Sequence, residues 1–373
     1  MTPYRHIFFE ELSKIVNLTV CYLSKTESGR SWQIWPRNYS YNYYIIRANK
    51  YLVNLNFIKL FLEKPDIIIL SGYNDPIIIL MFFKALLFKI PFIYWTEGIS
   101  EPHSLRFASR ARARALGLIT RPLRVFLVKK SRAIVVPGKI SKNYVNSLGA
   151  DLSKVFIAPN AIDNELFFDI SNKYLKQKKE LKEKLGLENK IIILYVGRII
   201  KIKGPQILLE VYKKIFKNYN NIVLVFVGSG NLLESLKEIC IKKGINNVIF
   251  TGSINNYKNL IGYYSISDIF VMPTFYDLWG FVINEAMTCG LPIISTYESQ
   301  AASEMLHSGE NGYIIKAGDE DELYKDIIKL ISDSNMRVKM GEKSKDIVKN
   351  QYNVKKMTKG FLYAIKYILG DVL

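Results

Sequence analysis

The first candidate for chemistry is a pair of cations, Arg198 and Lys203, in the segment GRIIKIKG. This segment follows the continuously apolar run from Ile191 to Val196, which is typical of a strand covered on both faces of a parallel sheet. Pro205 then opens a helical pattern. Ligands collect beyond the carboxyl ends of parallel strands, and helix N-termini favour anions. Two cations at this place could hold a diphosphate, or they could equally be solvated surface charges.

The second candidate is a pair of carboxylates, Asp277 and Glu285, which lie eight residues apart. Asp277 belongs to the loop after another apolar run. If a helix begins near Gly280, Glu285 lies on its second turn, and the backbone amides around Phe281 and Val282 form its positive end. This arrangement suits a carboxylate that binds a sugar hydroxyl and amides that bind a phosphate. The alternative is that a helix with such an apolar beginning belongs to the core.

The elements that must position these residues alternate regularly in the C-terminal half. Apolar runs predict strands at 191–196, 222–227, 248–250 and 269–272, and helical spacing predicts helices from Pro205, around 232–241 and around 258–264. Gly228 and Gly230 follow the second strand, where a backbone could approach a ligand closely, although a simple tight turn is the alternative. Alternating strands and helices predict a doubly wound α/β domain.

The N-terminal half alternates in the same way but less regularly, with predicted strands at 18–23, 67–70, 91–95 and 133–136. We therefore predict two open α/β domains in tandem, at residues 1–160 and 161–351. Residues 352–373 have a helical period, and this helix either stays with the second domain or crosses back to the first.

Composition places the chain among globular proteins, because 49% of its 373 residues are hydrophobic and 23% are charged. The three cysteines are far apart and offer neither a disulfide framework nor a paired metal site, which favours a reducing compartment. No uncharged apolar run reaches the ~18 residues that a membrane-spanning helix needs. The N-terminus lacks the pattern of a signal peptide.

Taken in order, these segments resemble the family-4 retaining glycosyltransferases. The resemblance rests on GR-x4-KG after one strand, VGSG after the next, and then two acids followed by EAMTCGLPII. It extends upstream to FIAPNAID and downstream to Glu304 and GENGYII. It implies the GT-B fold, in which two Rossmann-like, doubly wound α/β domains face each other across an interdomain cleft, with the acceptor side N-terminal. It also implies transfer of a sugar, with retention, from a nucleotide diphosphate sugar to a glycan or lipid-linked acceptor in polysaccharide, lipopolysaccharide or glycolipid synthesis.

The resemblance assigns roles residue by residue. Arg198 and Lys203 match the basic pair that neutralises the donor's diphosphate, and Glu285 matches the acid that binds the ribose hydroxyls. Asp277 stands where the family has a catalytic-site glutamate that contacts the donor sugar, and its shorter side chain leaves the sugar preference open. The remaining positions that match donor-binding backbone are Gly228, Ser253, Ile254, Phe281 and Val282.

On the N-terminal side, the predicted strand at 91–95 ends in Thr96-Glu97-Gly98, where many family members have a histidine close to the donor sugar or acceptor. Glu97 takes this place as a candidate catalytic residue, with a surface salt bridge as the alternative, and His103 follows as a weaker candidate. Lys139 and Asn160 match positions that face the cleft in the family. Family members also begin with a strand and a glycine loop, so we expect that the first strand of this domain is missing or lies upstream.

Two patterns bear on cofactors. No DxD motif follows a predicted strand, and the acids from Asp319 to Asp321 have the pattern of a helix cap and first turn. We therefore expect catalysis without a metal or another cofactor.

The net charge of +19 is concentrated in the N-terminal half, since residues 1–160 hold 23 Lys and Arg against 9 acids. No acid occurs from Pro102 to Ala150, and apolar residues lie between the cations from Arg106 to Arg132. In a family that often uses lipid-linked acceptors, this pattern predicts a cytoplasmic protein bound peripherally to an anionic membrane leaflet, with a solvated basic helix as the alternative. Two other functions stay open: a catalytically silent nucleotide-sugar-binding homologue and, without a recognisable motif, a nucleic-acid binder.

Overall fold

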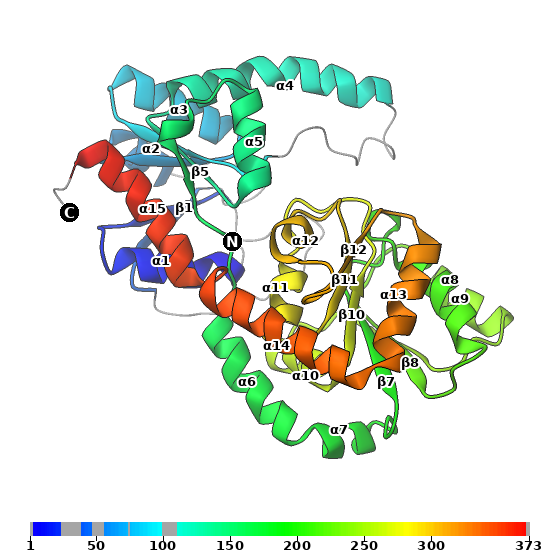
Figure 1. Ribbon diagram of the computed structural model, residues 1–373. Helices are drawn as coiled ribbons and strands as arrows, with labels where there is room; N and C mark the ends of the chain where they lie inside the picture. Colours follow the sequence, from blue (N-terminus) through cyan, green and yellow to red (C-terminus); the bar gives the residue numbers. More distant parts are fainter. Residues whose placement is uncertain (1–2, 24–38, 47–55, 74, 99–109, 371–373) are drawn as a thin grey trace. The chain divides into compact units, whose positions relative to one another are not determined.

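The computed structural model describes residues 3–23, 39–46, 56–73, 75–98 and 110–370, with only the backbone described at 3, 56 and 110–119. The described chain forms two compact units (Figure 1). Unit 1 contains the described residues up to 98, residues 110–162 and the C-terminal helix from Asn353 onward. Unit 2 contains residues 163–352.

Unit 2 is built on a six-stranded sheet in the order β12-β11-β10-β7-β8-β9, in which every pairing is parallel. The strands are β7 (Ile191–Val196), β8 (Ile222–Val227), β9 (Val248–Gly252), β10 (Ile269–Met272), β11 (Ile293–Thr296) and β12 (Gly312–Ile315). β8 and β10 are buried along their whole length, which explains their uninterrupted apolar sequences. The predictions for β7, β8 and β10 are confirmed at both ends, and β9 extends two residues further than predicted.

Helices flank this sheet in the alternating order that the sequence predicts. They are α6 (Asn164–Lys176), α7 (Lys178–Lys184), α8 (Pro205–Phe216), α9 (Leu233–Lys242), α10 (Tyr257–Ile266), α11 (Phe281–Thr288), α12 (Gln300–Met305), α13 (Glu320–Ser332) and α14 (Ser334–Asn350). One large cluster of buried side chains joins α8, α9 and α13 to one face of the sheet. Elsewhere in unit 2, helix α6 packs along α10, and helix α11 packs on α14.

The order of the strands reverses between β7 and its neighbour β10, because the chain moves outward from β7 to β8 and β9 and then returns to the other side. This is the switch point at which doubly wound sheets bind ligands. Asp268 links the starts of β7 and β10. Its carboxylate accepts a 2.9 Å hydrogen bond from the Ile192 amide and pairs with Lys178 and Lys182. Burial alone would raise the pKa of Asp268, but the two lysines and the amide lower it on balance.

Unit 1 contains a four-stranded parallel sheet in the order β3-β4-β5-β6. These strands are β3 (Ile68–Ser71), β4 (Phe92–Trp95), β5 (Ala133–Val136) and β6 (Val155–Ile157). Its helices are α1 (Pro3–Ser13), α2 (Asn56–Leu62), α3 (Pro76–Leu87), α4 (Arg110–Lys130), α5 (Lys139–Ser147) and α15 (Val354–Leu369), with the short 3₁₀ turn η2 at Leu152–Lys154. None of the helices in the described part of the chain is long and apolar enough to cross a membrane.

The two faces of this sheet carry different helices. Phe92 and Tyr94 of β4 point into a cluster with side chains of α3, α4 and α5, whereas Ile93 and Trp95 point into a second cluster with α1 and α15. Alternate residues of a strand point to opposite faces, so β4 contributes to both cores. Gly360 lets α15 come close to β6, since a β-carbon at that position would lie 2.3 Å from the Ile157 carbonyl oxygen.

The predicted strand at 18–23 forms, as β1 (Thr19–Tyr22), but not as a neighbour of β3 among the described residues. It pairs in parallel with β2 (Asn42–Ile45), which the sequence did not predict. The side chains of β2 are exposed or half-buried, so its sequence NYYI lacks the apolar run of a covered strand.

Candidate functional site

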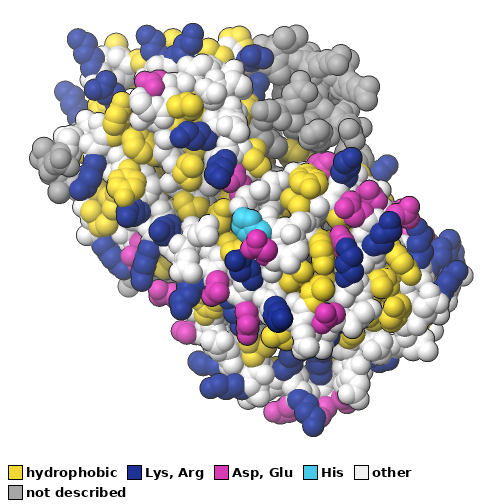
Figure 2. Space-filling view, viewed as in Figure 1, with side chains coloured by type: hydrophobic (Ala, Val, Ile, Leu, Met, Phe, Trp, Pro, Cys, Tyr) yellow, Lys and Arg dark blue, Asp and Glu magenta, His cyan; other side chains and the backbone are white. Residues whose placement is uncertain are grey.

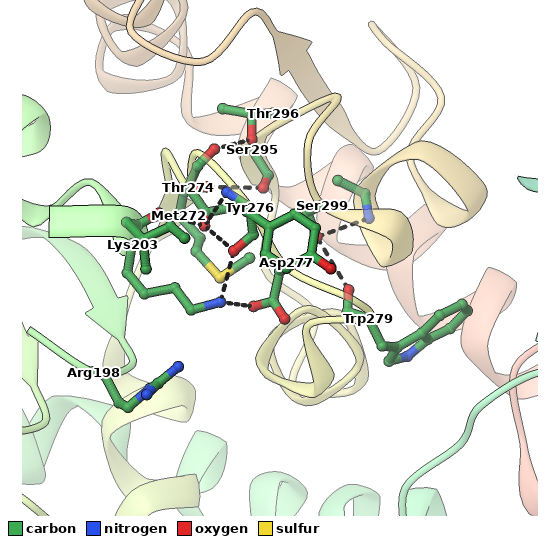
Figure 3. Close-up of polar contacts among 12 residues, drawn as sticks. Arg198, Lys203, Met272, Thr274, Tyr276, Asp277, Trp279, Ser295, Thr296 and Ser299 are labelled. Atoms are coloured by element: carbon green, nitrogen blue, oxygen red, sulfur yellow. Dashed lines mark hydrogen bonds and ion pairs between the residues drawn. The ribbon is translucent and has the colours of Figure 1, made fainter. Parts of the chain in front are cut away.

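The loops after β7 and β10 meet at the switch point of unit 2 through an ion pair. Lys203 is the last residue of the 3₁₀ turn η3 (Lys201–Lys203), and its Nζ lies 2.6 Å from Oδ2 of Asp277 (Figure 3). The same ammonium donates a 3.0 Å hydrogen bond to the carbonyl of Tyr276. The side chains of Lys203 and Asp277 are 13% and 22% exposed, so the pair is largely but not fully shielded from solvent. The structure thus brings together two of the predicted site residues.

Arg198 lies in the same loop and remains exposed. Its main chain is fixed, because the buried Tyr195 hydroxyl donates a 2.8 Å hydrogen bond to the Arg198 carbonyl. Burial raises the pKa of Tyr195, so this hydroxyl stays protonated as a donor. In Figure 3 the guanidinium makes no drawn contact with the Lys203–Asp277 pair. Arg198 is therefore a cation held at the strand edge by its backbone.

The glycines of these loops serve close packing between loops. A β-carbon on Gly228 would lie 1.9 Å from the Gly197 carbonyl oxygen, and one on Gly230 would lie 2.2 Å from the Ile199 carbonyl oxygen. Gly204 has φ +71°, and a β-carbon there would lie 2.0 Å from the Pro273 carbonyl oxygen. These contacts account for the glycines as a means of holding the β7, β8 and β10 loops against one another, a reason that the sequence alone did not suggest.

The loop that carries Asp277 is held by the loop after β11. The Asp277 amide donates to the Glu298 carbonyl, and the Gln300 amide donates to the Asp277 carbonyl, at 3.0 Å and 3.2 Å. Gly280, with φ +95°, ends this loop, and α11 begins at Phe281 as the sequence predicts. The first amides of α11, including those of Phe281 and Val282, therefore lie at the helix terminus where an anion is favoured.

Glu285 lies on the second turn of α11 and is only 1% exposed. Its Oε2 accepts a 2.6 Å hydrogen bond from the hydroxyl of Tyr264 on α10, and Tyr264 is itself fully buried. Sequence analysis missed this tyrosine, because its place at an apolar position of a helical pattern gives no sign of a polar partner. Trp279 is buried and donates to Asn284, in agreement with the core interpretation of this segment.

Ser253 and Ile254 follow β9 at the same edge of the sheet. The Ser253 hydroxyl donates a 2.7 Å hydrogen bond to the hydroxyl of Ser229 in the loop after β8. Ile254 is half-buried. The loops after β7, β8, β9 and β10 thus carry Arg198, Lys203, Gly228, Ser253, Ile254 and Asp277, whereas Phe281, Val282 and the buried Glu285 belong to α11.

Unit 1 has a second polar cluster, at the carboxyl edge of its own sheet. Glu97, just after β4, pairs through Oε1 with the guanidinium of Arg5 and accepts a 2.9 Å hydrogen bond from Asn160 after β6. Arg5 also donates to Asn160 at 2.8 Å and stacks over the Trp95 ring at 4.5 Å. Burial lowers the pKa of Arg5, and the charge of Glu97 opposes that change. Arg5 gave no sequence signal, because it lies far from its partners along the chain.

The structure describes only some of the other candidates from the N-terminal half. Lys139 begins α5 just after β5 and is exposed, at the same edge as Glu97. His103 lies outside the described residues. Of the basic segment from Arg106 to Arg132, α4 is described as a helix, and its Arg124 contacts the hydroxyl of Tyr144.

The acids at Asp319 to Asp321 begin α13, with Asp319 as the N-cap whose side chain accepts from the Glu322 amide at 2.9 Å. In the part of the chain that the structure describes, no group of three or more His, Cys, Asp or Glu side chains is arranged to hold a metal ion.

Comparison with known proteins shows which families and structures this chain is similar to. Residues 177–347, which contain the strand-edge site, match the family "Glycosyl transferases group 1". An uncharacterized glycosyltransferase of Methanocaldococcus jannaschii is 30% identical over 239 residues, which are 63% of this chain and 58% of that protein. Residues 177–347, in unit 2, therefore belong to the group 1 glycosyl transferases.

A second relative is the UDP-Gal:alpha-D-GlcNAc-diphosphoundecaprenol alpha-1,3-galactosyltransferase of Escherichia coli. It is 27% identical over 265 residues, 68% of this chain and 65% of the relative. Both alignments therefore span less than two thirds of the relative's length. Among solved structures, HepE of Anabaena in complex with UDP and glucose has a TM-score of 0.71 at 15% identity, covering 98% of this chain and 97% of that one. This likeness shows the GT-B fold that the sequence predicts.

Proposed function

We propose that this chain is a group 1 glycosyl transferase that moves a sugar from a nucleotide diphosphate sugar to a hydroxyl of a glycan or lipid-linked acceptor, with retention at the anomeric carbon. The observation that carries the proposal is the pairing of Lys203 with Asp277, beside Arg198, at the switch point of the unit 2 sheet. Cations and an acid converge there on the edge where doubly wound sheets bind ligands.

The leaving group of this reaction is a nucleoside diphosphate, which gains negative charge as its bond to the sugar breaks. Arg198 and Lys203 would stabilise that charge, and such stabilisation acts on the transition state more than on the bound substrate. The amides at the start of α11 add partial positive charge from fixed positions. In this proposal these groups neutralise the diphosphate without a metal ion.

Asp277 has two roles in the proposal. Its carboxylate orients the Lys203 ammonium, and the same side chain would contact the donor sugar next to the diphosphate. An ammonium group can contact a carboxylate and a phosphate oxygen together, so donor binding does not require the ion pair to break. Glu285 would bind the ribose hydroxyls from the place where the Tyr264 hydroxyl holds it.

Two further features of the proposal come from the relatives and from the charge pattern. The Escherichia coli relative is named for a lipid diphosphate acceptor, and HepE was solved with UDP and glucose, which supports a sugar nucleotide as donor and a lipid-linked glycan as acceptor. The basic segment from Arg106 to Arg132 would hold the protein on the anionic cytoplasmic face of a membrane. We do not expect nucleic acid as a partner.

A donor screen tests the enzyme proposal. The purified protein is incubated with UDP-, GDP- and ADP-linked sugars and a lipid diphosphate-linked sugar as acceptor, with and without EDTA, and release of the nucleoside diphosphate is measured. We expect turnover of one donor, unchanged by EDTA, and a product whose anomeric configuration by NMR matches that of the donor. Activity that EDTA removes and Mg²⁺ or Mn²⁺ restores would refute metal independence. Nucleotide binding without turnover would favour the silent homologue, and no binding would overturn the proposal.

The membrane part of the proposal has its own test. Replacing Arg110, Arg112 and Arg114 by glutamate should abolish sedimentation with anionic vesicles at low salt, because each cation near such a surface contributes about 1 kcal/mol. Nucleotide affinity should stay unchanged. A variant that still sediments fully would contradict a role for this segment.

A further inference from the structure

Two neighbouring helices of unit 1 expose large apolar side chains. On α3, Leu80, Phe83 and Leu87 are 47%, 54% and 74% exposed. They are spaced three and four residues apart and so form one stripe along the helix. The opposite stripe is the one that packs on the sheet, through Ile77, Met81, Phe82 and Ala85. The helix is therefore apolar on both its buried and its exposed sides, which a solvated surface helix is not.

The adjoining helix α2 also exposes large apolar side chains. Its Ile58 and Leu62, one helical turn apart, are 54% and 73% exposed. The two helices are fastened together by the buried Lys84 of α3, which donates to the carbonyls of Leu60 and Glu63 at the end of α2. We call Ile58, Leu62, Leu80, Phe83, Leu87 and the exposed Phe88 the α2–α3 apolar surface. Single exposed apolar residues are ordinary, but a group of six on two adjacent helices indicates an interaction surface.

The charges around this surface are mainly positive. Lys59, Lys64 and Lys89 are exposed on or beside the two helices. The C-terminal part of α4 packs against α3 through the rings of Phe126 and Phe82, and it brings the exposed Lys130 close to them. The exposed acids in the same part of the chain are Glu63 and Asp66. Figure 2 shows dark blue cationic side chains next to yellow apolar ones over this part of unit 1.

We propose that the α2–α3 apolar surface inserts into the headgroup layer of an anionic membrane. Apolar side chains bordered by lysines are the pattern of elements that lie in a membrane interface, where the apolar groups enter the acyl boundary and the cations meet lipid phosphates. A second copy of the chain would bring the same lysines face to face, so the charge favours a lipid surface over self-association. The sequence predicts apolar contacts with the membrane between Arg106 and Arg132, and this proposal adds a second apolar surface on α2 and α3.

Vesicle sedimentation with matched variants tests this proposal. The test variant carries Leu62→Ser, Phe83→Ser and Leu87→Ser. The control carries Leu185→Ser, Ile241→Ser and Val338→Ser, which remove three unit 2 side chains that are 50%, 81% and 59% exposed. All six side chains are at least half exposed, so both variants should fold, and equal thermal unfolding midpoints check this. The midpoint serves as the folding control because it does not depend on the transferase proposal.

With vesicles of equimolar phosphatidylcholine and phosphatidylglycerol, we expect the wild type and the control to sediment and the test variant to partition at least tenfold less. Phosphatidylcholine vesicles alone should bind all three weakly. Unchanged sedimentation of the test variant would overturn the proposal, even if substitution of Arg110, Arg112 and Arg114 removed binding. A wild-type dimer in analytical ultracentrifugation that the test variant loses, without vesicle binding by the wild type, would also overturn it.

Discussion

Replacing Lys203 and Arg198 one at a time separates the proposed catalytic role of the strand-edge cations from their structural role. Lys203→Ala removes the ammonium that contacts Asp277 and the Tyr276 carbonyl. Arg198→Ala removes an exposed guanidinium whose loop is held by its backbone instead. Both substitutions delete one positive charge beside the proposed diphosphate position. They differ in the contacts that are lost, because Lys203→Ala leaves Asp277 without its ion-pair partner, whereas Arg198→Ala removes an exposed side chain.

The expected changes in stability follow from burial. Exposed ion pairs contribute about 0–1 kcal/mol, and removing one partner of a buried pair costs about 3–5 kcal/mol. With side chains 13% and 22% exposed, the Lys203–Asp277 pair lies between these cases, and we expect Lys203→Ala to lower the free energy of unfolding by roughly 1–2 kcal/mol. That corresponds to a fall in Tm of about 2–8 °C for a unit of this size. Arg198→Ala should stay within about 0.5 kcal/mol of wild type.

The expected changes in turnover are similar for the two variants. Loss of a fixed group that stabilises developing charge costs about 2–4 kcal/mol in the transition state, or roughly 30- to 1000-fold in kcat/KM for the donor. Turnover is measured as nucleoside diphosphate release, and unfolding by a thermal shift of the same samples. Lys201→Ala, an exposed lysine of the same turn, is the matched control and should change neither value.

Two results would refute this reasoning. If both variants keep the wild-type kcat/KM, the cations do not serve the leaving group. If Lys203→Ala loses activity only in proportion to its loss of folded protein while Arg198→Ala stays fully active, the lysine is structural. Asp277→Asn should also lower Tm, because it leaves the ammonium without its charged partner.

Three further predictions concern single residues. Glu285→Gln should raise the donor KM more than it lowers kcat, because ribose contacts are alike in the ground and transition states; an unchanged KM would contradict the assigned role. Gly228→Ala should lower the free energy of unfolding by about 1–3 kcal/mol, since its β-carbon would lie 1.9 Å from the Gly197 carbonyl oxygen. Urea unfolding measures this against Gly262→Ala, whose β-carbon meets only ordinary contacts, and equal stabilities would argue against it. Asp268→Asn should flatten the loss of stability in acid. The lowered pKa of Asp268 gives a stabilisation that is present above its unfolded pKa of ~3.9 and lost as the pH falls through the folded value, so parallel acid curves from thermal unfolding would count against this.

The local sequence determined the framework of the unit 2 site. A strand covered on both faces must be apolar without interruption, so the limits of β7, β8 and β10 could be predicted at both ends. Pro205 and Gly280 likewise marked the starts of α8 and α11. Because the carboxyl ends of parallel strands share one edge, the sequence also predicted that the residues after those strands lie on the same side of the sheet.

Unit 1 was less predictable because its elements carry weaker local signals. β2 has exposed and half-buried side chains, so no apolar run marks it, and its pairing with β1 could not be predicted. The exposure of the apolar stripe on α3 could not be predicted from the sequence either. A helix that is apolar on both sides has the sequence of a buried helix, and only the fold shows which side is covered.

Tertiary structure alone decided which polar groups meet. Lys203 and Asp277 are 74 positions apart, and Arg5 and Glu97 are 92 apart, so no local spacing links either pair. Tyr264 occupies an apolar helical position, yet its hydroxyl is the partner of Glu285. Periodicity reports how deeply a side chain is buried, whereas a hydrogen bond or ion pair depends on distances between elements that only their packing sets. The sequence therefore determined which candidate residues share one edge of the sheet, and the packing of loops and helices determined which charges face each other there.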